Sequence, residues 1–152
     1  MCARIARTDL LYGGCYVHVI SRSIRELKIF KDNEDFELFK KLWLIEKRKS
    51  GFRVFHYCFM QTHFHMAAEV PEVHKFWLSL ARVKSRYAST FHAKYRLSGP
   101  MWRERYKSLL IENEGYLLAC GRYIEDNPVK AGLVKRGEDW QFSSYRSIGF
   151  DD

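Results

Sequence analysis

Two histidines, His63 and His65, are the residues whose types and spacing most directly suggest chemistry. They lie in an apolar stretch, residues 52–70, that is typical of two strands joined by a tight polar turn at Gln61 and Thr62. Strand side chains alternate between faces, so the two histidines share one face with their Cα atoms roughly 6 to 7 Å apart, and the apolar residues fill the other. Two imidazoles at this spacing can reach one metal ion. An isolated pair of this kind is usually just two polar residues on a solvated face.

A second pair of polar residues, Tyr123 and Asn127, belongs to a predicted helix. Asn113 is a typical N-cap, and the apolar pattern after it predicts a helix that continues through Tyr123. Residues four apart overlie each other, which places Tyr123 and Asn127 together at the edge of the buried face. Pro128 disfavours helical geometry at the residue before it, which leaves the alignment of the two side chains open.

The rest of the chain supplies the elements that position these side chains. In order, the predicted elements are a strand at 15–21, a helix from Asp32 or Asn33 to about Gly51, the two strands within 52–70, a helix from 71 to about 96, a strand at 107–111, and the helix capped by Asn113. His18, in the first strand, shares a face with Tyr16 and Ile20. We expect it to be a packed or half-exposed histidine, with metal binding as a minor alternative.

Length and composition indicate one compact domain. A chain of 152 residues with 47% hydrophobic content can bury one core but is too short for two ordinary domains. We expect a single domain over residues 1–152, with residues 128–152 as a C-terminal tail that wraps back on it. No apolar run approaches the ~18 residues of a membrane span, and no secretory signal is evident. The four cysteines form no Cys-x-x-Cys pair and are expected to be reduced and structural.

The formal charge of +8 favours a polyanionic partner such as nucleic acid. Eight basic residues and one acid lie between residues 82 and 107, interleaved with aromatic residues that could stack on the bases of single-stranded DNA. For the helical part of this segment, a solvated helix with inward-facing aromatics is an equal alternative, whereas the loop from residue 102 favours binding. The basic residues at 40–49 are assigned to solvent. The candidate DNA-binding residues are Arg82, Lys84, Arg86, Trp102, Arg103, Arg105 and Lys107.

Four motifs together resemble one enzyme family. They are Tyr57-Cys58-Phe59-Met60 before His63-Phe64-His65, then Trp102-Arg103-Glu104-Arg105-Tyr106-Lys107-Ser108, then Tyr123-Ile124-Glu125-Asp126-Asn127-Pro128-Val129-Lys130-Ala131-Gly132-Leu133-Val134, and Trp140 with Phe142-Ser143-Ser144-Tyr145-Arg146. On these motifs, nearly the whole chain resembles the single-tyrosine transposases of the HUH endonuclease superfamily, most closely the bacterial branch associated with repetitive extragenic palindromes (REP). The chain departs from that family at Gln61-Thr62, where Pro-Asn is common, and in its short C-terminal end.

The resemblance implies a role for each candidate residue. His63 and His65 match the family's metal-binding histidines, Asn127 the position whose amide completes the metal site, and Tyr123 the nucleophile. The implied cofactor is Mg²⁺ or Mn²⁺, with open positions that can accept a phosphate oxygen. The implied reaction is cleavage and strand transfer on single-stranded or hairpin DNA through a 5′-phosphotyrosine, without ATP.

The resemblance also implies an α+β fold. The expected architecture is a small antiparallel sheet, ferredoxin-like or RRM-like, with helices packed on one face and the histidine face open to the tyrosine helix and DNA. The predicted order of elements agrees with it. Relatives occur as monomers and homodimers, and we expect a cytoplasmic bacterial protein, nucleoid-associated through DNA, with no membrane partner. The competing hypothesis is a nucleic-acid-binding module on the same fold whose catalytic site is vestigial.

Overall fold

The computed structural model describes residues 3–4, 13–103 and 106–147. Its elements are β1 (Ala3–Arg4), β2 (Cys15–Arg22), η1 (Ile24–Glu26), α1 (Asn33–Ser50), β3 (Arg53–Phe59), β4 (His63–Val70), α2 (Val73–Tyr95), β5 (Lys107–Ile111), α3 (Glu114–Glu125), α4 (Asn127–Lys130), η2 (Gly137–Asp139) and η3 (Ser144–Arg146). The strands form one antiparallel sheet in the order β1-β5-β2-β4-β3. The predicted α+β class and antiparallel sheet are confirmed, and the short edge strand β1 is an addition. None of the helices in these ranges is long and apolar enough to span a membrane.

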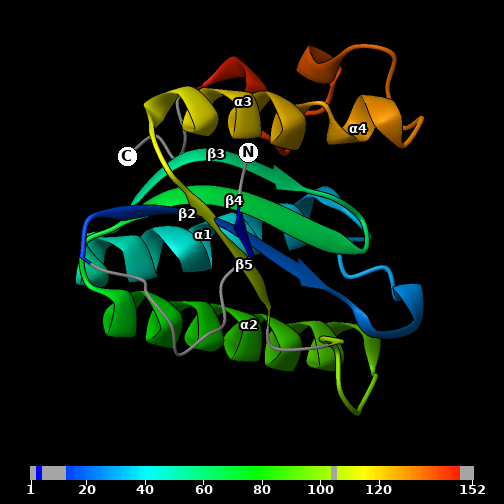
Figure 1. The fold of residues 1–152 in the computed structure, drawn as a ribbon. Helices are drawn as coiled ribbons and strands as arrows, with labels where there is room; N and C mark the ends of the chain where they lie inside the picture. The colour runs from blue at the N-terminus through cyan, green and yellow to red at the C-terminus, as the bar shows by residue number, and fades with distance from the viewer. Residues whose placement is uncertain (1–2, 5–12, 104–105, 148–152) are drawn as a thin grey trace.

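Helices lie on both faces of this sheet (Figure 1). α1 and α2 cover one face, and α3 crosses the other. The main core lies under α1 and α2, where Phe64 of β4 packs with Phe39 and Trp43 of α1, all fully buried. A smaller core under α3 contains Ala67 of β4 and Ile124. The alternation of β4 therefore sends Phe64 to one core and Ala67 to the other, and the histidine face is the α3 face.

Polar N-cap residues fix where α1 and α3 begin. Asp32 is the N-cap of α1, where its Oδ1 accepts from the Asp35 backbone N–H at 2.9 Å, and the Asp35 side chain accepts in return. Gly51 ends this helix in the left-handed conformation, with φ of 70°. Asn113 caps α3, because its Oδ1 accepts from the Tyr116 N–H at 3.0 Å. Both predicted caps are confirmed. Of the two candidates for the first helix, Asp32 and Asn33, the cap is Asp32.

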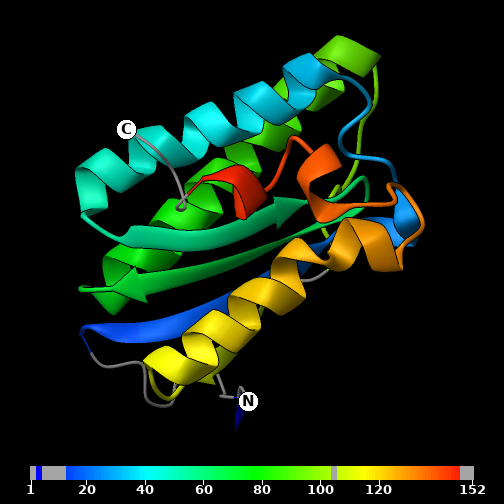
Figure 2. The ribbon, with the colours of Figure 1, turned by 90° about the horizontal axis from the view of Figure 1, so that it is seen from above.

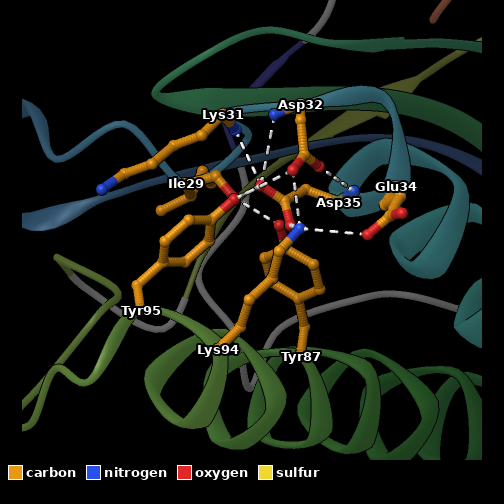
Figure 3. A network of polar contacts seen from close by, with 8 residues as sticks. All are labelled: Ile29, Lys31, Asp32, Glu34, Asp35, Tyr87, Lys94 and Tyr95. Atoms are coloured by element: carbon orange, nitrogen blue, oxygen red, sulfur yellow. Dashed lines mark hydrogen bonds and ion pairs between the residues drawn. The ribbon is translucent and has the colours of Figure 1, made fainter.

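A polar network ties the start of α1 to the end of α2 (Figure 3). Lys94 Nζ lies 2.7 Å from Asp32 Oδ2 and 3.0 Å from Asp35 Oδ1. The Tyr95 hydroxyl donates to Asp35 Oδ2 at 2.6 Å. The hydrogen bond from Lys94 is the main reason that the pKa of Asp32 lies below its usual value. This network fastens the helical layer on the sheet face opposite α3.

The last described residues pack along β3. The Phe59 N–H donates to the Phe142 carbonyl at 2.9 Å, and Trp140 Nε1 donates to the Phe59 carbonyl at 3.1 Å. The Phe142 ring stacks on Phe36 of α1, with centroids 3.6 Å apart. This segment therefore joins β3 to α1 at the edge of the sheet.

Candidate active site

β4 presents His63 and His65 on the face that α3 covers. Their ring centroids lie 5.1 Å apart. In the register between β2 and β4, Arg22 is opposite His63 and Ile20 is opposite His65. The structure thus brings the two rings together, as strand alternation predicts.

His65 is the more buried of the two, with 2% of its surface exposed. Its Nδ1 lies 3.0 Å from Nε2 of His18, whereas its Nε2 is buried and has no hydrogen-bond partner among the described residues. Burial lowers the pKa of His65 to about 2, with His18, His63 and Arg22 adding to the effect. The ring is therefore neutral at neutral pH.

The contact between His18 and His65 has two possible proton arrangements, because a neutral imidazole has one donor and one acceptor nitrogen. If His18 donates, the buried Nε2 of His65 carries a proton without an acceptor, which costs about 1–3 kcal/mol. If His65 donates from Nδ1, its Nε2 keeps a lone pair. Histidines that bind metals generally donate their other ring N–H in this way. The orphaned Nε2 therefore fits the requirements of a metal ligand.

His18 lies beside this pair on the neighbouring strand. It is 3% exposed, and burial lowers its pKa to about 4. Its predicted role as a packed histidine is confirmed, but sequence reasoning missed the hydrogen bond to His65. The sequence does contain a sign of this hydrogen bond, because His18 is a third histidine in a predicted strand. Only the strand register, however, shows that His18 lies close enough to contact His65.

His63 lies at the outer end of the group. Burial, together with the nearby charge of Arg22, lowers its pKa to about 4. Thr62 Oγ1 lies 3.2 Å from its Nδ1, so the polar turn contacts this nitrogen and leaves Nε2 for another partner. The turn that departs from the family pattern thus still supports the ring.

α3 crosses the sheet above β4 (Figure 2). Its residue Tyr123 lies over the histidines of the same chain. The Tyr123 ring centroid lies 6.1 Å from that of His65 and 6.2 Å from that of His18. The side chain is 48% exposed, so substrate can reach it. Lys130 Nζ lies 4.7 Å from the same ring centroid. A phenol, imidazoles and an ammonium group therefore meet at one place on the surface.

Asn127 follows the tyrosine helix directly. α3 ends at Glu125, and Asn127 opens the short helix α4, where Pro128 occupies the first turn and is tolerated. Asn127 Nδ2 donates to the Tyr123 carbonyl at 3.0 Å. This bond holds the amide at the end of α3 and leaves its oxygen as the group that could bind a cation.

Two imidazoles and one amide oxygen would form a mixed nitrogen and oxygen donor set. Among the described residues, no group of three or more His, Cys, Asp or Glu side chains that could hold a metal ion is found. A set of three protein donors would leave a cation with positions open for substrate oxygens. Such a set suits Mn²⁺ and can also accept Mg²⁺.

A polar contact and a glycine fix α3 against β3. Glu125 Oε1 lies 2.8 Å from His56 Nδ1 and accepts from the Ser144 hydroxyl at 2.6 Å. Burial raises the pKa of Glu125, but the hydrogen bonds from His56 and Ser144 outweigh it, so the net shift is downward. A Cβ at Gly121 would lie 2.5 Å from the His56 ring, so only glycine allows this approach. The anchor lies two residues from Tyr123 and sets the height of the phenol above the sheet.

The family described as Transposase IS200 like matches residues 12–127. The chain belongs to this family. It is a DNA transposase with a tyrosine nucleophile. A Haemophilus influenzae protein described as a REP-associated tyrosine transposase is 27% identical over 152 residues, which cover 91% of this chain and 84% of the relative.

Solved structures of transposases share the fold. A REP-associated tyrosine transposase bound to a REP hairpin has a TM-score of 0.75 at 22% identity, over 93% of this chain and 82% of that one. A transposase from Deinococcus radiodurans has a TM-score of 0.51 at 14% identity, over 80% of this chain and 97% of that one. The resemblance to the REP-associated branch is thereby confirmed.

Three predicted DNA-binding residues of this transposase lie on α2, on the sheet face opposite the histidines (Figure 1). Arg82 and Arg86 are exposed, and Arg82 lies 3.5 Å from Glu46 of α1. Lys84 is only 7% exposed, and its Nζ lies 5.0 Å from the Trp102 ring centroid. Lys84 is therefore buried beside Trp102, and its role in DNA binding stays a prediction.

The ring of Trp102, which the sequence predicts to be available for base stacking, packs against the main core. Its centroid lies 5.9 Å from that of Phe64, and its Nε1 donates to the Lys84 carbonyl at 3.2 Å. The indole therefore supports the fold. Arg105, another predicted DNA-binding residue, lies outside the described residues.

The remaining predicted residues, Arg103 and Lys107, lie closer to the histidines. The Arg103 N–H donates to the Arg22 carbonyl at 2.9 Å, and Lys107 is opposite Ile20, which is itself opposite His65. Lys107 thus belongs to the histidine face of the sheet. Sequence reasoning missed Arg22, although it follows His18 at a spacing that keeps both on one face.

Proposed function

We propose that this transposase cleaves and rejoins single-stranded DNA beside a hairpin, with Tyr123 as the nucleophile. The observation that carries the proposal is the position of the Tyr123 ring, 6.1 Å from the His65 ring of the same chain. A net charge of +8 suits DNA as the substrate. The solved relative bound to a REP hairpin supports hairpin DNA as the class of substrate.

His63, His65 and Asn127 would hold a divalent cation, Mg²⁺ or Mn²⁺. When bound, the cation would supply Lewis-acid activation of the scissile phosphate. The buried Nε2 of His65, which lacks a partner among the described residues, supports this assignment. Because the histidines are neutral at neutral pH, they present lone pairs without first losing a proton.

The bond changes can be assigned to this chain's own residues. The phenol oxygen of Tyr123 attacks phosphorus, the bond from phosphorus to the 3′-oxygen breaks, and the proton lost by the phenol is balanced by one taken up by the 3′-oxygen. One phosphodiester replaces another, so neither ATP nor water is consumed, and a second 3′-hydroxyl can reverse the step. Lys130, 4.7 Å from the phenol ring centroid, can bind the phosphate during attack.

The same geometry supports a site completed within one chain. Tyr123, His65 and His18 meet through contacts of one sheet and its own α3. Glu125 and Gly121 hold that helix on β3 of the same chain. A monomer therefore has every residue that the proposed reaction uses.

The test uses a labelled hairpin with a single-stranded flank, incubated with Mn²⁺ or Mg²⁺. We expect a protein–DNA adduct that survives denaturing electrophoresis and disappears in Tyr123→Phe. Tyr116→Phe is the matched control, because Tyr116 is an exposed tyrosine of the same helix. Hairpin binding without any adduct, across a panel of hairpins, would instead favour a binding module with a vestigial site.

A further inference from the structure

A basic cleft opens where β2 ends, next to His63. Its volume is about 740 Å³, within the range of ligand-binding clefts. Its walls include Arg22, Arg25, Glu26, Thr62, Ser98 and Arg103. The three arginines are exposed and outnumber the one glutamate, so the lining attracts anions.

Backbone hydrogen bonds hold the walls of this cleft together. The three that join its segments, each 2.9 Å long, run from Ser23 N to Thr62 O, from Ile24 N to Met101 O, and from Arg103 N to Arg22 O. They connect the end of β2 to the β3–β4 turn and to the segment before β5. The cleft therefore exists before any ligand arrives.

The loop that carries Arg25 has an uncommon backbone conformation. Arg25 has φ of 48° and Glu26 has φ of 54°, so two consecutive non-glycine residues are left-handed. Side chains other than glycine, asparagine and aspartate rarely adopt this conformation. Strain of this kind is retained mainly where function needs it, and here it holds the Arg25 side chain at the wall of the cleft.

The cleft and the nucleophile lie at opposite ends of the histidine row. The Tyr123 ring contacts His18 and His65. His63 is the first residue of β4, and Thr62, in the turn before it, lines the cleft. In a phosphoryl displacement the attacking and leaving oxygens lie roughly in line, on opposite sides of phosphorus. An attack by Tyr123 therefore directs the leaving 3′-oxygen towards His63 and the cleft.

We propose that this cleft holds the DNA segment that ends in the released 3′-hydroxyl, with its phosphates bound by Arg25 and Arg103. The assignment rests on the proposed role of Tyr123. It gives the cleft a purpose in strand transfer, because a retained 3′-hydroxyl remains close enough to attack the phosphotyrosine and restore the strand. The ligand class is the phosphodiester backbone of single-stranded DNA.

The test compares a cleft variant with a variant of equal charge change elsewhere. Arg25→Asn with Arg103→Gln removes two cleft charges, and asparagine tolerates the left-handed backbone at residue 25. Lys41→Gln with Arg48→Gln removes two exposed charges from α1, on the other face of the sheet. The probes are a fluorescent mixed-sequence tetranucleotide with a 3′-hydroxyl, and a hairpin labelled on the segment that becomes the 3′-hydroxyl product.

We expect the cleft variant to bind the tetranucleotide about tenfold more weakly, with a salt slope smaller by about 0.7 for each phosphate that the removed charges had neutralised. It should release the labelled product faster and rejoin a smaller fraction of the adduct that forms. The proposal would be overturned if the cleft variant and the α1 variant had equal affinity for the tetranucleotide and equal rates of product release. It would also be overturned if the cleft variant lost as much affinity for a hairpin without the single-stranded flank as for the flanked hairpin. If the unmodified protein forms no adduct, the role of Tyr123 fails, whereas the tetranucleotide affinities still decide whether the cleft binds the strand.

Discussion

Nε2 of His18 lies 3.0 Å from Nδ1 of His65 beneath the Tyr123 ring. Both imidazoles are buried, and their pKa values are lowered to about 4 and about 2. Two neutral rings in contact must share one proton between the facing nitrogens, so the state of His18 determines which nitrogen of His65 is free. A residue outside the donor set can thus control a metal ligand.

Replacing His18 with Phe should weaken Mn²⁺ binding to the DNA-free protein by about 10- to 100-fold, because His65 Nδ1 loses its partner. His18→Gln offers an acceptor oxygen and should retain most of the affinity. Titration calorimetry measures the binding, and ¹⁵N NMR of the metal-free protein should find the His65 proton on Nδ1. Equal Mn²⁺ affinity in His18→Phe and the unmodified protein would show that this hydrogen bond has no such role.

His63→Ala and His65→Ala should both abolish cleavage but differ in their effect on stability. His65 is 2% exposed, so its removal leaves His18 Nε2 buried and unpaired, at a cost of about 1–3 kcal/mol in the free energy of unfolding. His63 lies nearer the surface, and its loss should cost less than about 1 kcal/mol. Urea denaturation monitored by circular dichroism distinguishes the two. A larger loss in His63→Ala would contradict the arrangement described.

Local patterns predicted much of this fold. The β3–β4 turn, the caps at Asp32 and Asn113, and the shared face of the two histidines all follow from interactions within a few residues. The contact between His18 and His65 depends on strand register across 47 positions, which local chemistry does not determine. The burial of Lys84 likewise depends on a tertiary contact with Trp102. Charge counting placed the DNA-binding segment on α2, without information about which face of the sheet α2 covers.

Gly121→Ala should slow adduct formation more than it weakens hairpin binding. The added Cβ would lie 2.5 Å from the His56 ring, so α3 must shift or His56 must leave Glu125. Overpacking of this kind costs about 1–3 kcal/mol of stability, and a shift of the phenol by about 1 Å can cost about 100-fold in rate. Single-turnover adduct assays alongside fluorescence anisotropy measure both effects. Leu118→Ala, on the exposed side of the same helix, should leave the adduct rate within about twofold, and an equal rate in Gly121→Ala would refute the anchoring role.

Stability of the metal-free protein should fall as pH drops from about 6.5 to about 4. The folded-state pKa values of His18 and His63 are lowered to about 4, so over this window the unfolded chain binds protons that the folded chain does not. The stabilisation from keeping His18 neutral is complete above pH 6.5, and about 3 kcal/mol of it is lost by pH 4.

Thermal melts in chelator over this pH range measure the effect. His18→Phe should make the dependence shallower, with His63 and His65 carrying the rest, whereas His74→Gln, which changes an exposed histidine, should leave it unchanged. A dependence in His18→Phe as steep as in the unmodified protein would show that His18 does not carry it.

The most direct test of the account is to identify the residue that becomes linked to DNA. After reaction with a flanked hairpin and Mn²⁺, proteolysis and mass spectrometry should find a 5′-nucleotide on the peptide that contains Tyr123. The exposed tyrosines Tyr116 and Tyr145 provide an internal comparison and should remain unmodified. DNA linked to either of them, with Tyr123 unmodified, would contradict the assignment of the nucleophile.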